Sequence, residues 1–135
     1  MKVTVSRKAH FNAAHRLYRK DWSDEKNQTI FGKCSNPHFH GHNYELVVHV
    51  TGIINPDTGY VIDMKILKDL IKEEVEEKMD HKNLNEEVPE FYDKIPTAEN
   101  MVIVIYEALK PHMNPDHELA VTLYETPRNF VSYSG

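Results

Sequence analysis

The chain has 135 residues, a length that suits one domain with one hydrophobic core. Its 16 Lys and Arg residues against 21 Asp and Glu residues give a formal net charge of −5, which argues against a module that binds duplex nucleic acid. No apolar run approaches the roughly 20 residues that span a bilayer, so we expect no membrane partner. The single cysteine, Cys34, excludes an internal disulfide framework and favours a reducing, cytoplasmic compartment.

Two stretches alternate between apolar and polar residues, with the period of two that is typical of a half-buried strand. The first runs from Val3 to Ala13 and the second from His40 to Thr51. Between them, residues 16–37 are polar and irregular, and we expect a long loop of the kind that is often functional. A turn cluster at residues 55–59 predicts that residues 60–62 pair back as a short third strand.

Two helices are expected in the second half of the chain. Asp63 is a suitable N-cap for a helix from Met64 to about Met79, which has one apolar and one charged face. Thr97 is a second N-cap, and it favours a buried helix that continues to Pro111, although the apolar centre of that segment would also suit a strand.

The last part of the chain returns to strand patterns. Residues 119–124 alternate, and a turn at residues 127–129 leads into a final strand at residues 130–133. The order is therefore strand, strand, short strand, helix, helix, strand, strand, with no βαβ alternation. We predict one α+β domain over residues 1–135, in two layers, with an antiparallel sheet and both helices on one of its faces.

Three histidines are candidate metal ligands. His40 and His42 flank Gly41, so in a strand their side chains point to the same face. His15 ends the first strand on the register of its apolar residues, and it would meet the other two if the first two strands are neighbours. Three histidines without a fourth protein ligand are typical of a catalytic zinc site with an open position.

Other interpretations of these histidines remain open. Each can be an ordinary surface histidine or a core histidine with a hydrogen-bond partner. An Asp or Glu can join as a further ligand, and His38 can compete with His40, although it lies in a turn region after Pro37. A structural zinc site fits poorly, because such sites usually include several thiolates and this chain has one cysteine.

Three further groups are candidates for chemistry. Cys34 is either a small buried hydrophobe or a reactive thiol, for which the adjacent Lys33 would favour the thiolate form. Asp80 beside His81 is either an ordinary helix end or a proton relay. Glu125, at the end of a strand, either reaches solvent or grips a ligand through two neighbouring N–H donors.

Six short motifs, taken in order, resemble those of the 6-pyruvoyl-tetrahydropterin synthase family, which includes the 6-carboxytetrahydropterin synthases. They are Phe11–Leu17, Gly32–Pro37, His40–Tyr44, Asp80–Leu84, Pro96–Asn100 and Tyr124–Thr126. The resemblance covers nearly the whole chain. One departure is Phe39, where members of this spacing often carry glycine, and a phenyl ring there would reshape the mouth of the pocket.

The resemblance implies a two-layer tunnelling fold (T-fold), an antiparallel four-stranded sheet with two helices on one face. It also implies that subunits join their sheets into a barrel as trimers and that two trimers stack as a homohexamer. The implied reaction is that of a lyase, which converts the small-molecule substrate 7,8-dihydroneopterin triphosphate to 6-pyruvoyl-tetrahydropterin with loss of triphosphate.

The resemblance also implies roles for individual residues. The zinc ligands would be His15, His40 and His42. The general base would be Cys34, with Asp80 and His81 as its proton-relay partners. The pterin ring would be bound by Glu125, with Thr97 and Glu99 beside it.

Three alternatives to this function are kept. The first is a 6-carboxytetrahydropterin synthase of the queuosine route, which uses the same substrate and zinc; the separation of Cys34 from His40 favours the pyruvoyl type. The second is a zinc-binding module without catalysis, in which Cys34 would be dispensable. The third is a zinc hydrolase, which would not need Cys34, Asp80, His81 and Glu125 together.

Overall fold

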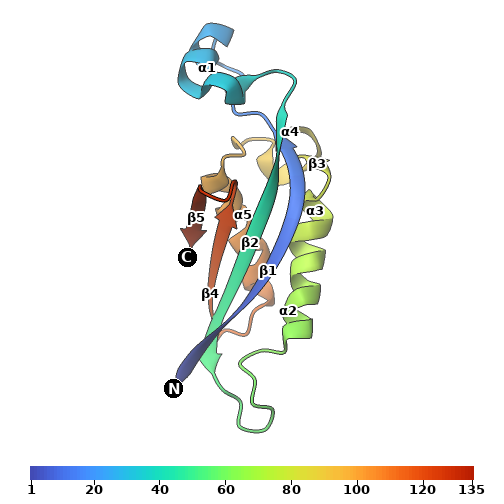
Figure 1. The fold of residues 1–135 in the computed structure, drawn as a ribbon, viewed down its shortest axis with the longest axis vertical. Coiled ribbons are helices and arrows are strands. Elements are labelled where there is room, and N and C mark those ends of the chain that lie inside the picture. The colour runs from blue at the N-terminus through green and yellow to red at the C-terminus, as the bar shows by residue number, and fades with distance from the viewer.

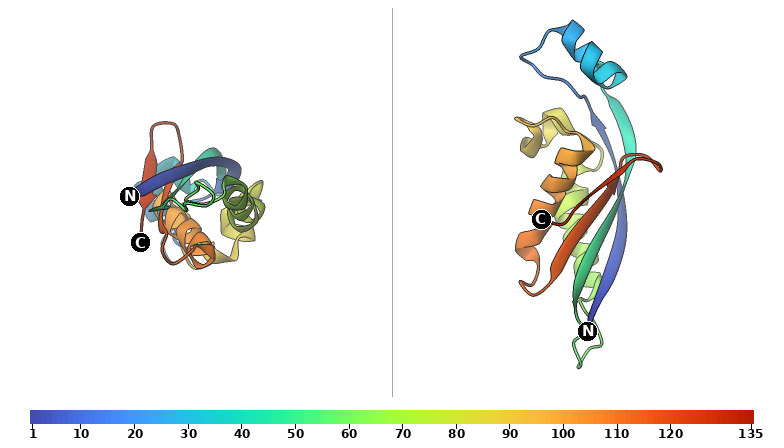
Figure 2. Two further views of the ribbon diagram at one scale, coloured as in Figure 1. Left: turned by 90° about the horizontal axis from the view of Figure 1, so that it is seen from below. Right: turned by 90° about the vertical axis from the view of Figure 1, so that its left-hand side faces the viewer.

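The computed structural model describes all residues from 1 to 135 as a curved sheet with helices on one of its faces (Figure 1). The strands follow the spatial order β3-β1-β2-β4-β5, and neighbouring strands are antiparallel except for the parallel pair β1 and β3. They are β1 (Lys2–His15), β2 (His40–Ile53), β3 (Lys82–Asn83), β4 (Glu118–Tyr124) and β5 (Phe130–Tyr133). Seen from the side, the helices leave the other face of the sheet bare (Figure 2). The predicted two-layer α+β architecture is confirmed.

The helical layer contains both expected helices. The α-helices are α1 (Asp24–Phe31), α2 (Met64–Ile71), α3 (Glu77–Met79), α4 (Leu84–Glu87) and α5 (Ala98–Leu109). A π-helical turn at Lys72–Glu76 joins α2 to α3, so the helix expected from Met64 to Met79 is continuous. Both predicted N-caps are confirmed, since Asp63 accepts a hydrogen bond from the backbone of Lys65 and Thr97 accepts one from Asn100. No helix combines the length and apolar character that crossing a bilayer requires.

The sheet has five strands, as the sequence pattern predicted and one more than the resemblance implied, but the short strand lies elsewhere. Residues 60–62 form no strand, and the turn before them is closed by the hydrogen bond from the Asn55 amide to the Tyr60 carbonyl, 2.8 Å. The extra strand is β3, two residues long, which follows α3 and pairs with Ala13 and Ala14 of β1. The chain leaving α3 passes along the edge of β1 and adds this parallel bridge.

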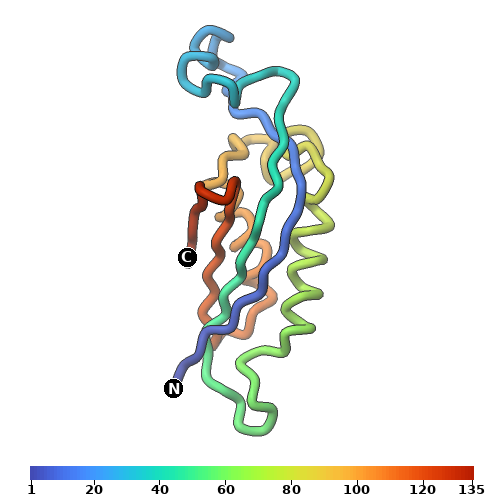
Figure 3. Tube along the Cα trace, viewed as in Figure 1, coloured from blue at the N-terminus to red at the C-terminus, as the bar shows by residue number.

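The segment expected to be a long loop contains a helix. Residues 16–39 leave the end of the sheet and return to it, as the chain trace shows at the top of the view (Figure 3). Helix α1 lies in this excursion, with Ser23 as its N-cap, Asp24 and Glu25 in its first turn and Gly32 at its end. These are ordinary helix signals, and eight residues were too few to show a clear apolar face beside them.

The two long strands pair over their whole length, from Lys2 opposite Ile53 to His15 opposite His40. Their alternate side chains face the helices and are buried, and in this layer the rings of Phe11 and Tyr44 stack with centroids 5.1 Å apart. The bare face is polar. Across it a row of hydrogen bonds joins four strands, and its members are Ser6, His49, Thr122 and Ser132.

Two adjacent valines test this division of faces. Val48 is fully buried under the helices, whereas Val47 faces the bare side and is partly exposed. We predict that Val48→Ala lowers the free energy of unfolding by about 2–3 kcal/mol, because it removes two buried methyl groups and leaves a cavity. The matched variant Val47→Ala should cost less than about 1 kcal/mol. Denaturant titration of both variants measures the difference, and equal losses would contradict the assignment of faces.

Candidate active site

Three imidazoles meet at the end of the sheet where β1 finishes and β2 begins. His15 and His40 are direct partners in the register, and His42 is the next residue on the same face. One nitrogen from each ring lies within 4.8 Å of the other two. The predicted grouping of His15, His40 and His42 is thus present in the geometry, and His38 is not a member of it.

Hydrogen bonds orient the innermost ring. His15 is 1% exposed, and its Nδ1 lies 2.8 Å from the carbonyl oxygen of Pro96, just before α5. Because a carbonyl only accepts, Nδ1 carries the proton and donates, which leaves Nε2 free as a ligand. The hydroxyl of Tyr44 lies 3.3 Å from the same Nδ1 and can only accept there.

The donor set suits a divalent transition metal. Nδ1 of His40 is buried without any hydrogen-bond partner, a position that normally costs free energy unless something binds there. Three imidazoles with no thiolate among them match the ligands of open catalytic sites. The residues present therefore fit a bound metal, and zinc is compatible with them.

Burial also disfavours protonation of two of these histidines. It lowers the pKa of His15 to about 4, against the opposing effect of the hydrogen bond to Pro96 and with a smaller contribution from the two neighbouring imidazoles. Burial and the proximity of His42 hold the pKa of His40 below its usual value as well. At neutral pH both rings are therefore in the form that binds a metal.

Cys34 lies beside this cluster. It belongs to a 3₁₀ turn at Gly32–Ser35, which is fixed to the residues that follow His15: the Leu17 amide donates to the Cys34 carbonyl at 2.8 Å, and Nε of Arg16 donates to the Ser35 carbonyl at 2.7 Å. A pocket of about 770 Å³ brings the cysteine together with His40 and His42. Cys34 is only partly buried, so the thiol is reachable from this pocket.

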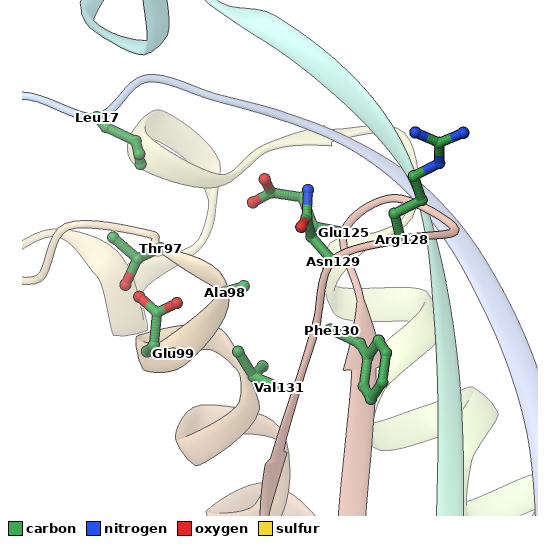
Figure 4. A pocket seen from close by; sticks show the side chains of 9 residues that line it. All are labelled: Leu17, Thr97, Ala98, Glu99, Glu125, Arg128, Asn129, Phe130 and Val131. Atoms are coloured by element: carbon green, nitrogen blue, oxygen red, sulfur yellow. The ribbon is translucent and has the colours of Figure 1, made fainter. Parts of the chain in front are cut away.

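A second pocket, of about 450 Å³, holds the three residues expected to bind a ring. Glu125, just after β4, points into it, and Thr97 and Glu99 face it from the start of α5 (Figure 4). The Glu125 carboxylate also comes within 4.0 Å of Nε2 of His42. The imidazole cluster therefore lies between this ring pocket and the pocket that contains Cys34.

Asp80 and His81 form a pair, but not in the Cys34 pocket. Oδ2 of Asp80 is 3.0 Å from Nδ1 of His81, and Oδ1 accepts the amide of Asn12 at 2.9 Å. That backbone hydrogen bond, followed by the contact with His81, lowers the pKa of Asp80. The side chain of His81 is 78% exposed and lines a separate pocket with residues of the bare face such as Asn12 and Asn43. Within one chain, the structure thus does not bring this pair to Cys34.

One residue of the ring pocket was not anticipated. The sequence predicted only a turn at residues 127–129, yet the side chain of Asn129 is directed into the same space as Glu125, while Arg128 points away from it (Figure 4). The Asn129 carbonyl also accepts the amide of Glu125 at 3.0 Å. An amide in a turn is so common that the sequence carries no signal for this role.

The low pKa of His15 predicts that acid destabilises the metal-free protein. The unfolded chain takes up a proton on His15 near pH 6.5, whereas the folded chain resists it until about pH 4. The stability present above pH 6.5 is therefore lost as the pH falls through this window, by up to about 3 kcal/mol. Urea titrations of chelator-treated protein from pH 7.5 to 4 measure this slope.

Two glutamine variants identify the source of the slope. His15→Gln should reduce the slope of the stability profile between pH 6.5 and 4, whatever its effect at neutral pH, and the slope that remains includes the contribution of His40. His10→Gln, at an exposed position of the same strand, should leave the profile unchanged. A profile that keeps its slope in His15→Gln would refute the assignment.

Comparison with known proteins agrees with this arrangement. The family model described as 6-pyruvoyl tetrahydropterin synthase matches residues 4–135. A protein of Pongo abelii named 6-pyruvoyl tetrahydrobiopterin synthase is 47% identical over 97% of this chain and 90% of its own length, and the Homo sapiens protein of that name is 45% identical over the same shares. The structure of Caenorhabditis elegans 6-pyruvoyl tetrahydropterin synthase superposes with a TM-score of 0.93 at 39% identity, covering 100% of this chain and 96% of that one. The chain therefore belongs to the 6-pyruvoyl tetrahydropterin synthase family.

Proposed function

We propose that this protein is a lyase that converts 7,8-dihydroneopterin triphosphate to 6-pyruvoyl-tetrahydropterin and triphosphate. The names of its relatives support this reaction. The observation that carries it is the position of three clustered imidazoles between a cysteine pocket and a pocket with a carboxylate, since Glu125 is 4.0 Å from His42. Residues 1–135 would act as one domain, and the single cysteine favours a cytoplasmic location.

The pterin ring would bind in the ring pocket. The Glu125 carboxylate can accept hydrogen bonds from two neighbouring N–H groups of the ring, a bidentate geometry that fixes orientation as well as adding affinity. Thr97 and Glu99 would contact the ring from the start of α5. This placement leaves the C6 side chain of the substrate directed toward the imidazoles.

Zinc is the metal that we propose for His15, His40 and His42. When bound, it would supply Lewis-acid polarisation of the side-chain hydroxyls and so acidify the adjacent C–H bonds. Cys34, as the thiolate, would take up a proton from the side chain. His81 would return a proton, with Asp80 orienting its ring through the 3.0 Å contact.

The reaction balances without another redox cofactor. Oxidation of the C1′ alcohol to a carbonyl supplies the two electrons that reduce the dihydropterin ring to the tetrahydro level. Elimination of triphosphate converts C2′ to the second carbonyl and C3′ to a methyl group, with no net gain or loss of electrons. The protons that Cys34 takes and His81 gives are exchanged within the same substrate. No nicotinamide or flavin is needed, and the sequence has no Gly-rich dinucleotide fingerprint.

An oligomer would complete this site. The Asp80–His81 pair lies outside the Cys34 pocket of its own chain, at the edge of β1. That edge is paired only at Ala13 and Ala14, and the outer edge of β5 has no neighbour. Unpaired edges favour strand pairing between chains. The resemblance implies a homohexamer, a dimer of trimers, and we include it in the proposal, with the pair of one subunit serving the cysteine of another.

Product analysis tests the proposed reaction. Zinc-loaded protein incubated anaerobically with 7,8-dihydroneopterin triphosphate should release triphosphate and a tetrahydropterin with a three-carbon diketo side chain, identified by mass. A carboxylate product with released acetaldehyde would instead identify a 6-carboxytetrahydropterin synthase. Unchanged substrate in the presence of bound zinc would favour a non-catalytic zinc module, and hydrolysis without change of the ring would favour a zinc hydrolase.

The role of Cys34 is tested separately. We predict that Cys34→Ala retains zinc and binds dihydroneopterin, but loses turnover by about 10²–10⁴-fold, because removal of a general base has this typical cost. His40→Ala serves as the comparison and should lose the metal. Metal analysis and single-turnover rates at matched zinc content distinguish the two variants. If Cys34→Ala lost zinc as His40→Ala does, the cysteine would be a ligand and not the base.

A further inference from the structure

Phe39 has an unusual backbone. Its φ of +67° lies in the left-handed region, which bulky side chains rarely adopt. The residue is held there from both sides: its amide donates to the Asn36 carbonyl at 3.0 Å, and β2 begins at the next residue, His40. Strained residues of this kind persist where their surroundings fix them, and they are frequent at ligand-binding sites.

The residue also lines the pocket that contains Cys34, His40 and His42. Most of the surface that lines this pocket is apolar, although several of its residues, such as Lys33 and His38, are charged or polar by type. Phe39 supplies the one phenyl ring of this lining, and it is partly buried and does not extend freely into solvent. A phenyl ring at this place can contact the carbon skeleton of a ligand.

This inference rests on the proposed function. If a pterin binds as proposed, the two pockets define the direction in which its C6 side chain extends. Glu125 lies in the ring pocket and is 4.0 Å from His42, which itself lines the pocket with Phe39. A pterin whose ring is bound by Glu125 therefore extends its C6 side chain past the imidazoles toward the phenyl ring. A one-carbon side chain would end near the imidazoles, whereas a three-carbon side chain would continue beyond them.

We propose that Phe39 is a specificity-determining residue whose phenyl ring packs against the outer carbons of the substrate's C6 side chain. The left-handed backbone at Phe39 sets the direction of the ring as the chain enters β2. The ring thereby positions the side chain between His40 and Cys34, and it favours three-carbon over one-carbon substituents.

Ligand binding tests this contact without relying on turnover. The probes are 7,8-dihydroneopterin, with a three-carbon side chain, and 6-hydroxymethyl-7,8-dihydropterin, with a one-carbon side chain, titrated into zinc-loaded protein. Phe39→Ala should weaken binding of dihydroneopterin by about 5- to 10-fold, as expected for the loss of one aromatic contact. Binding of the one-carbon ligand should change by less than about 2-fold, and Phe39→Leu should largely restore the affinity for dihydroneopterin.

A glycine variant separates the side chain from the backbone. Phe39→Gly also removes the ring, but glycine adopts a positive φ without strain, so this variant should melt several degrees above Phe39→Ala. If the ring is responsible, both variants lose affinity for dihydroneopterin to the same extent. A loss in Phe39→Ala alone would show that only the backbone matters and would overturn the proposal, as would equal losses for both ligands or no loss for either.

The wild-type protein distinguishes this inference from the proposed function. If it binds both pterins and forms the 6-pyruvoyl product, while the variants bind as it does, only the role of Phe39 is overturned. If it binds neither pterin when loaded with zinc, the proposed function fails and this inference fails with it.

Discussion

The register between β1 and β2 is the constraint on which the site depends. Because side chains alternate along a strand, a slip of one residue would turn His40 and His42 toward the bare face, away from His15. The register is fixed by burial at positions of the same alternation, including Phe11 and Tyr44, whose rings stack next to the imidazoles. Each such side chain contributes about 1.5–3 kcal/mol by leaving water. The apolar core and the three clustered histidines thus depend on the same alternation of side chains along β1 and β2.

Segments from distant parts of the sequence complete the site at the end of these strands. The carbonyl of Pro96, ahead of α5, sets the tautomer of His15, and the 3₁₀ turn with Cys34 is bonded to Arg16 and Leu17, directly after that histidine. Both segments are thereby held in place by hydrogen bonds to residues at or just after the end of β1. Burial supplies the rigidity, and the desolvation that lowers the pKa of His15 also keeps this ring in the neutral form that can bind a metal.

The sequence predicted the features that depend on local pattern. The two long strands, the N-caps Asp63 and Thr97 and the grouping of the three histidines follow from periods and caps, and the structure contains them. Features that depend on contacts between segments distant in the sequence were not predicted. The strand expected at residues 60–62 does not form, because no neighbouring strand edge receives it, whereas β3 forms from a polar pair of residues because the chain passes along β1. In the same way, no local pattern could place Asp80 and His81 outside the pocket of Cys34.

Two non-glycine residues, Phe39 and His81, have a positive φ, and both lie near the candidate site. Phe39 directly precedes β2, and His81 directly precedes β3. His81 also follows the end of α3, a position where a left-handed residue is usually glycine. A side chain in that conformation costs roughly 1–2 kcal/mol. Glycine would avoid this cost at both positions, and the core does not require a larger residue there, since neither side chain is fully buried. The strain is therefore best explained by a need for the side chains themselves, an imidazole beside Asp80 and a phenyl ring in the pocket of His40 and His42.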